Sequence, residues 1–230
     1  MLAKQDEVIE NFKSAKIFDK SSVQDIVDYD ADYPILKDEN KRNLFEAAIK
    51  LRNENKPLEA LKRFNILLDQ KPTDDQKTAL FTLIGNTCLL IGDYDEAISK
   101  HKKALKVAEQ TNNLLAKGVA LGNIGLIYHD KGEQEKAPQY YHEDLEIFRD
   151  IGYKLGEATA LGSIGLVYHD KGEPEKALQY YQESLAINRE IEYKLGEASQ
   201  LGNIGVIYAD KGESEKAIQY LEQAQTILNN

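Results

Sequence analysis

The chain has 230 residues, of which 42% are hydrophobic and 30% are charged, and its formal net charge is −10. No apolar run approaches the roughly 18 residues that a membrane-spanning helix needs, and the mixed-charge start, MLAKQDEVIENFK, lacks the apolar stretch of a signal peptide. The acidic balance disfavours nucleic acid and anionic lipid as main partners, because both need clustered Lys and Arg. The single cysteine, Cys88, excludes an internal disulfide framework and fits a reducing cytoplasm.

Residues 1–40 differ from the rest of the chain, since they lack the pattern that repeats later. Apolar residues within 8–12 predict a short amphipathic helix, an N-cap at Ser22 predicts a second one over 22–29, and Asp-Tyr-Pro at 32–34 predicts a turn. We expect this segment to be an N-terminal cap that covers the first repeat of the chain, and the alternative is a separate interaction arm.

Residues 41–230 predict five units with boundaries at about 41–77, 78–117, 118–157, 158–197 and 198–230. The last three are near-copies that begin LGNIGLIYHDKG at Leu121, LGSIGLVYHDKG at Leu161 and LGNIGVIYADKG at Leu201. Residues 118–157 and 158–197 share 28 of their 40 residues, which can be counted along the chain. A fixed period of this length indicates stacked supersecondary units that bury their apolar faces against their neighbours.

Within each unit the apolar spacing of three and four predicts two helices with a tight turn between them. In the unit 118–157 the first helix ends near Gly132, which can take a positive φ, and the second ends near Gly152. Pro174 suits the first turn of its helix, whereas Pro138 lies about one turn into the equivalent helix and predicts a local distortion there. Cys88 occupies a core position and should be unreactive.

The spacing Leu-x2-Ile-Gly-x2-Tyr, then Ala, then an aromatic residue four positions later, resembles the tetratricopeptide repeat. The residues that carry this resemblance are Leu121, Ile124, Gly125, Tyr128, Ala137 and Tyr141, with their equivalents Leu161, Ile164, Gly165, Tyr168, Ala177 and Tyr181. The 40-residue period is similar to the longer repeats of kinesin light chains and spindle-orientation adaptors. The resemblance implies an all-α fold, a right-handed superhelical solenoid of helix-turn-helix repeats, and a non-enzymatic adaptor that binds a partner's peptide or helix in its concave groove.

The residues that repeat without an obvious packing need are the candidates for this groove. The resemblance implies that the amide and hydroxyl side chains contact a peptide backbone, and that the first glycine of each helix lets that backbone approach, with close packing as the alternative. Leucine and valine would supply apolar contact, and the aspartates would select Lys or Arg. These residues are Gly122, Asn123, Leu126, His129, Asp130, Gly162, Ser163, Leu166, His169, Asp170, Gly202, Asn203, Val206 and Asp210.

The alternative function is self-association through the last helix or the N-terminal arm. The last helix carries Leu221, Ala224, Ile227 and Leu228, and no further repeat follows in this sequence to cover it. No nucleophile–base pair, glycine-rich phosphate loop or zinc-like spacing is evident, so we expect neither an enzyme nor a bound metal or cofactor. The sequence does not identify the partner.

Overall fold

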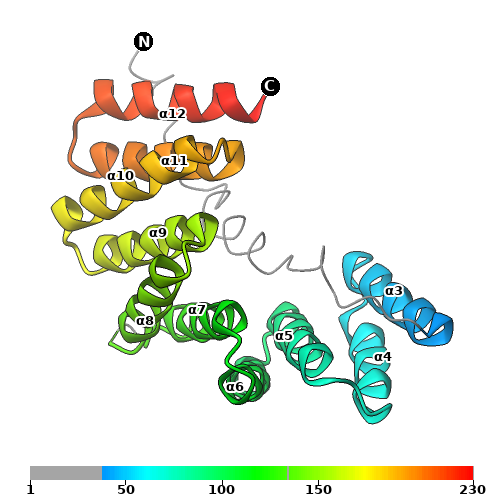
Figure 1. Cartoon of the computed structure of the whole chain (residues 1–230). Coiled ribbons are helices and arrows are strands. Elements are labelled where there is room, and N and C mark those ends of the chain that lie inside the picture. The colour runs from blue at the N-terminus through cyan, green and yellow to red at the C-terminus, as the bar shows by residue number, and fades with distance from the viewer. Residues whose placement is uncertain (1–37, 134, 230) are drawn as a thin grey trace. The chain divides into compact units, whose positions relative to one another are not determined.

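A computed structural model describes residues 38–133 and 135–229, and all of its regular elements are α-helices (Figure 1). The expected helices and turn in residues 8–34 lie outside the described residues. The all-α prediction is confirmed, because the described residues form ten helices and no strand. The helices are α3 (Glu39–Asn53), α4 (Pro57–Asp69), α5 (Asp74–Leu90), α6 (Tyr94–Gln110), α7 (Leu114–Asp130), α8 (Ala137–Asp150), α9 (Lys154–Asp170), α10 (Pro174–Glu190), α11 (Lys194–Asp210) and α12 (Ser214–Leu228).

The helices follow one another as five helix-turn-helix pairs, from α3–α4 to α11–α12. We call the helices of a pair its first and second helix. The expected boundaries at 78, 118, 158 and 198 fall inside α5, α7, α9 and α11, four residues after each first helix begins. Because the pattern is periodic, the place where a unit is cut is arbitrary, and the helix starts give the natural frame.

The turns within the last four helix pairs depend on glycine, whereas the turn between α3 and α4 has its positive φ at Asn55. Gly132, Gly172 and Gly212 have φ of 73°, 71° and 76°, a left-handed conformation that glycine adopts at little cost. The amide of Gly132 donates to the carbonyl of His129 at 2.8 Å, and the amide of Glu133 donates to Tyr128 at 2.8 Å. These bonds satisfy the last carbonyls of α7, so the predicted helix end at Gly132 is confirmed.

The described residues divide into two compact units, 38–143 and 144–229. In the first, α3 to α7 contact one another in chain order. In the second, α9 to α12 also contact in order, and the two first helices α9 and α11 touch as well. The core of the second unit is apolar and includes Ala177, Tyr181, Leu185, Leu201, Ile204 and Ile207.

In α5, α7, α9 and α11 a glycine packs against a large side chain of the paired second helix. A Cβ placed on Gly165 would lie 2.7 Å from ring carbons of Tyr181, and one on Gly125 would lie 2.8 Å from the ring of Tyr141. Real Cβ atoms essentially never come this close, so the glycines permit the helices to approach. Gly125 and Gly165, two of the residues that carry the resemblance to the tetratricopeptide repeat, are therefore packing residues.

Pro138 shortens the second helix of its pair, as predicted. α8 begins at Ala137, whereas α10 begins at Pro174, which is three residues earlier in the repeat. The amide of Lys136 donates to Glu133 at 2.9 Å in a turn that precedes the helix. Pro138 therefore lies in the first turn of α8, where no partner for a backbone N–H is needed.

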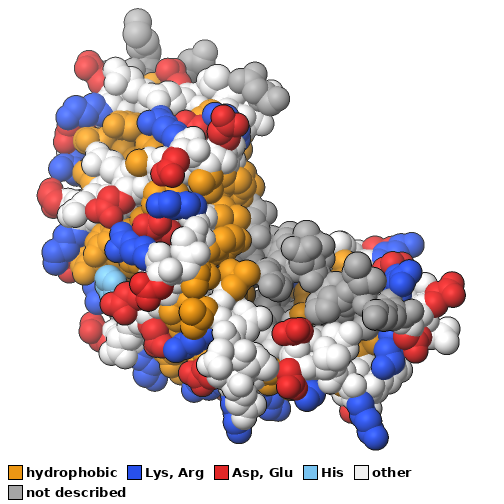
Figure 2. All heavy atoms as spheres, in the orientation of Figure 1, with side chains coloured by type: hydrophobic (Ala, Val, Ile, Leu, Met, Phe, Trp, Pro, Cys, Tyr) orange, Lys and Arg blue, Asp and Glu red, His pale blue; other side chains and the backbone are white. Residues whose placement is uncertain are grey.

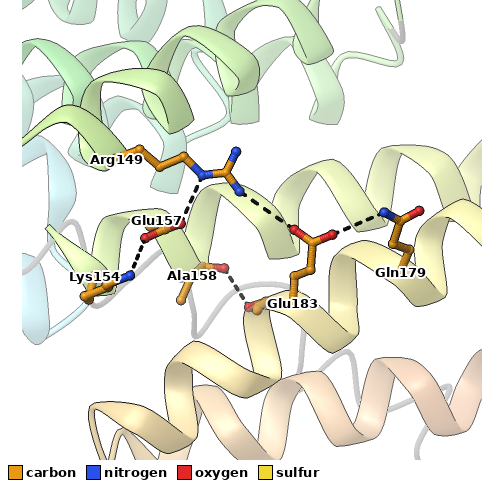
Figure 3. A network of polar contacts seen from close by, with 7 residues as sticks. Arg149, Lys154, Glu157, Ala158, Gln179 and Glu183 are labelled. Atoms are coloured by element: carbon orange, nitrogen blue, oxygen red, sulfur yellow. Dashed lines mark hydrogen bonds and ion pairs between the residues drawn. The ribbon is translucent and has the colours of Figure 1, made fainter. Parts of the chain in front are cut away.

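Buried carboxylates join each second helix of the unit 144–229 to the next first helix (Figure 3). Glu157 accepts from Arg149 Nε at 3.0 Å and from Lys154 Nζ at 3.1 Å. Glu197 repeats the arrangement with Arg189 at 2.8 Å and Lys194 at 2.9 Å, and its side chain is only 9% exposed. Burial raises the pKa of Glu197, but the hydrogen bonds from Arg189 and Lys194 outweigh it and leave that pKa below its ordinary value.

Replacing Glu197 by glutamine should lower the free energy of unfolding by about 2 kcal/mol at pH 7, because two charge-assisted hydrogen bonds are lost. Since the folded-state pKa is lowered, this stabilisation is present above the unfolded-state pKa and disappears as the pH falls through the folded one. Urea unfolding of both proteins at pH 7 and pH 3 measures this. Glu190→Gln, which changes an exposed carboxylate at the end of α10, is the control. Equal losses of stability from the two substitutions at pH 7 would contradict a stabilising role of Glu197 between Arg189 and Lys194.

Candidate functional site

The candidate groove residues of the unit 144–229 form a half-buried stripe on α9 and α11. Ser163 and Leu166 on α9, and Asn203 and Val206 on α11, are each partly exposed, while the residues beside them in the helices are buried. The two helices contact each other directly, so these four side chains belong to one surface. Around α9–α11, Figure 2 shows hydrophobic side chains in a band flanked by charged ones.

A polar contact joins the ends of these two helices. Nε2 of His169 lies 3.1 Å from Oδ2 of Asp210, and the side chains are 28% and 43% exposed. The structure therefore brings His169 of one repeat into contact with Asp210 of the next, which the repeat pattern alone does not indicate. Asp170, next to His169, is also exposed. A histidine beside Asp210 means that a basic ligand would have to compete with the imidazole for this carboxylate.

Gly162 and Gly202 are buried, and at Gly162 the space is occupied. A Cβ on Gly162 would lie 2.9 Å from Nε2 of Gln200, whose side chain is only 2% exposed. Gln200 in turn has Oε1 at 3.5 Å from Nδ2 of Asn203. Close packing, one of the two interpretations considered for these glycines, thus accounts for Gly162. Sequence reasoning missed Gln200, although it stands where the earlier repeats have Ala120 and Ala160.

In the unit 38–143 the equivalent residues lie on α7. Gly122, Leu126 and His129 are half-buried and Asp130 is exposed. Nδ1 of His129 is 3.8 Å from Oδ1 of Asp130. Asn123 is only 2% exposed, and its amide nitrogen has no hydrogen-bond acceptor among the described residues. Asn123 is therefore much less accessible to a ligand than Asn203.

Two further polar side chains of this unit, Asn86 and His101, are buried, which the sequence pattern does not indicate. Asn86 on α5 is 8% exposed, and neither atom of its amide has a hydrogen-bond partner in the described structure. His101 on α6 is fully buried at the position of Tyr141 and Tyr181, and burial lowers its pKa to about 3. A Cβ on Gly85 would lie 2.6 Å from its ring, so His101 is a neutral packing residue.

Cysteine reactivity, metal binding and membrane insertion can each be examined in the part of the chain that the structure describes. Cys88 is 3% exposed, and burial raises the pKa of its thiol to about 11, so it is unreactive at neutral pH. Across residues 38–133 and 135–229, no cluster of three His, Cys, Asp or Glu side chains could hold a metal ion. No described helix combines the length and apolar character needed to cross a membrane.

A family model described as the tetratricopeptide repeat matches residues 77–150 and 156–230, which is more than half of the chain. The chain belongs to the tetratricopeptide repeat family. Among curated tetratricopeptide relatives, it is 38% identical over 56 residues to the photosystem I assembly protein Ycf3 of Rippkaea orientalis, covering 24% of this chain and 31% of that protein. The Ycf3 protein of Acaryochloris marina is 31% identical over 85 residues, covering 36% of this chain and 49% of that protein. The chain thus spans less than half the length of these relatives.

Solved tetratricopeptide structures share the fold at low sequence identity. The sensor-containing signal transduction ATPase of Pyrococcus horikoshii gives a TM-score of 0.73 at 23% identity, covering 96% of this chain and 34% of that one. A Rap protein complexed with competence and sporulation factor gives a TM-score of 0.69 at 15% identity, covering 80% of this chain and 52% of that one. A kinesin light chain-related protein of Podosopora anserina with nearly identical TPR-like repeats gives a TM-score of 0.65 at 13% identity, covering 81% of this chain and 93% of that one.

The last helix, α12, does not expose the apolar face that the sequence predicts for self-association. Leu221 and Ala224 are both 0% exposed, because α12 turns its apolar stripe onto α11, where Leu221 packs against Gly205. Of the expected face, only the half-buried Ile227 and Leu228, which is 40% exposed, remain accessible. The exposed Gln225 stands where Leu145 and Leu185 are buried in earlier repeats. This surface of α12 is more polar than the sequence pattern implied.

Proposed function

We propose that the chain is a non-enzymatic adaptor of the cytoplasm that binds an extended peptide or a helix of a partner protein along the first helices of its repeats. The tetratricopeptide scaffold is consistent with protein–protein interaction. The observation that carries the proposal is the stripe formed by Ser163, Leu166, Asn203 and Val206, which is half-buried rather than packed away or fully solvated.

Each member of the stripe suits one part of a peptide. The hydroxyl of Ser163 and the carboxamide of Asn203 can pair with backbone groups of any sequence, since the amide both donates and accepts. Leu166 and Val206 offer apolar surface that a ligand side chain would cover. Gln200 holds Asn203 in place from within the protein, because its Oε1 lies 3.5 Å from the Asn203 amide nitrogen.

The charge at the end of the stripe favours a basic residue in the partner. Asp170 and Asp210 are exposed, and the chain as a whole is acidic with a net charge of −10. A Lys or Arg of the ligand would displace His169 from Asp210 or share that carboxylate with it.

Two named similarities agree with a binding role. A structural neighbour is a Rap protein complexed with competence and sporulation factor, and the curated relatives are described as photosystem I assembly proteins. We extend from these only the class of function, in which a repeat surface holds another polypeptide. The partner of this chain has to be found by experiment.

Affinity capture from source lysate should recover a partner that the Ser163→Ala/Asn203→Ala double variant retains at least about 10-fold less, since two backbone hydrogen bonds at about 1 kcal/mol each are lost. The matched control is Gln225→Ala, which removes an exposed amide from α12. Quantitative mass spectrometry of the captured proteins gives the comparison. A partner set that is the same for wild type, double variant and control would count against binding at this stripe.

A further inference from the structure

The second helices of the unit 144–229 carry two successive sets of side chains whose members are equivalent in the repeat. The first involves Arg149 of α8 with Gln179 and Glu183 of α10. The second involves Arg189 of α10 with Gln219 and Gln223 of α12, each 40 residues later in the sequence. The two sets differ at one position, where Gln223 stands in the second set in place of Glu183 in the first.

In the first set a carboxylate of the protein lies beside the arginine (Figure 3). Oε2 of Glu183 lies 3.7 Å from Nη2 of Arg149, and Gln179 donates from Nε2 to Glu183 Oε1 at 3.3 Å. The Nε of Arg149 is already used by Glu157 at 3.0 Å. Glu183 is thus held by a guanidinium from one helix and a carboxamide from its own.

In the second set no such carboxylate is present. Arg189 donates from Nε to Glu197 at 2.8 Å, as Arg149 does to Glu157. Within the described residues no ion pair joins Arg189 to α12, and its side chain is 50% exposed. A hollow of about 400 Å³ lies here, lined by Gln182, Leu185, Ala186, Arg189, Gln219, Tyr220 and Gln223.

We propose that this hollow between α10 and α12 binds the side-chain carboxylate of a glutamate from a partner protein. The terminal nitrogens of Arg189 present the planar donor pair that matches a carboxylate. The amides of Gln219 and Gln223 can each donate a further hydrogen bond. Glu183 shows, within the same fold, which group the equivalent residues hold.

The apolar part of the hollow suits the rest of a glutamate side chain. Leu185 is buried, with 6% exposure, and forms apolar floor beside Arg189. The ring of Tyr220 is fixed by stacking on Tyr208, with centroids 5.5 Å apart. These two residues can cover the methylene groups while the carboxylate reaches Arg189. The second helices carry this site, so it is separate from the stripe on α9 and α11.

Nuclear magnetic resonance of the Arg189 Nε–H group offers a direct test, because this resonance reports contacts of the guanidinium. The probes are the capped peptides acetyl-Ala-Glu-Ala-amide and acetyl-Ala-Gln-Ala-amide, added to the whole chain at low salt. We expect a saturable shift with the glutamate peptide and an affinity at least about 5-fold weaker with the glutamine peptide. Equal responses to the two peptides, or no saturable shift with the glutamate peptide, would overturn the proposal.

Two reciprocal substitutions and one control sharpen the test by exchanging the residues that distinguish the two sets. Gln223→Glu supplies an internal carboxylate as at Glu183 and should weaken binding of the glutamate peptide at least about 20-fold, whereas Gln223→Ala, which removes one donor without adding a carboxylate, should weaken it only about 5-fold. Glu183→Gln should remove the internal carboxylate from Arg149 and add a saturable shift at Arg149 Nε–H. Undiminished binding to Gln223→Glu, or the absence of any response at Arg149 in Glu183→Gln, would contradict the assignment.

Discussion

Replacing Tyr181 by alanine should lower the free energy of unfolding by about 3–5 kcal/mol, the usual cost of deleting a buried aromatic side chain. Tyr181 is 1% exposed and lies in the apolar core of the unit 144–229. Its ring fills the space that Gly165 leaves on the facing helix. Chemical denaturation followed by circular dichroism measures the change, as a shift in the unfolding midpoint at constant slope.

The neighbouring Tyr180 provides the matched control. It is half-buried, and its ring stacks on Tyr168 with centroids 5.4 Å apart and an interplanar angle of 7°. Tyr180→Ala should cost about 1 kcal/mol, because one stacked pair at the surface is lost. If the two alanine variants were equally stable, the inward direction of Tyr181 in the fold would be wrong.

The same contact predicts a coupling between Gly165 and Tyr181. Gly165→Ala alone should destabilise by about 1–3 kcal/mol, since its Cβ meets a fixed ring. In the Tyr181→Ala background that clash is absent, and alanine should instead gain up to about 1 kcal/mol from helix propensity. A double-mutant cycle measures the difference. Additive effects would show that the glycine is not retained for this approach.

Replacing His101 by leucine should make the chain more resistant to acid. His101 is fully buried, and burial lowers its pKa to about 3 from an ordinary value of 6.5. The unfolded chain therefore takes up a proton below pH 6.5 that the folded chain refuses until about pH 3. Stability is lost over this window, by about 2 kcal/mol between pH 7.5 and pH 5 at 1.4 kcal/mol per unit.

Leucine is the matched replacement, because Leu221 occupies the equivalent position against Gly205. The variant should lose about 2 kcal/mol less than the wild type when the pH falls from 7.5 to 5, as followed by urea unfolding at each pH. It also removes two ring nitrogens that have no hydrogen-bond partner in the described structure. Parallel pH profiles of the two proteins would mean that His101 is not buried as a neutral residue.

Periodicity in the sequence predicted those features that depend on one helix pair alone. The glycine turns at Gly132 and Gly152 and the late start of α8 at Pro138 each follow from local backbone rules. Such features can be read from one repeat, because the residues concerned are close in sequence or fixed by helical spacing.

Contacts between successive pairs could not be predicted in this way. The approach of His169 to Asp210 and the position of Gln200 over Gly162 depend on how far one helix is rotated against the next. The sequence pattern places Leu221 on an outer face because no further repeat follows the last helix, whereas in the structure Leu221 is buried against α11 within the same pair. A repeat pattern states which residues are equivalent, and it does not state which of them meet.

Site-specific photocross-linking tests the proposed peptide-binding stripe most directly. A benzophenone amino acid is placed at Leu166, at Val206 or, as the control on α12, at Gln225, and each protein is irradiated with the captured partner. The account predicts that the partner is cross-linked from Leu166 and Val206 and at least about 10-fold less from Gln225. Cross-linking from Gln225 alone, or equally from all three positions, would contradict binding along the first helices.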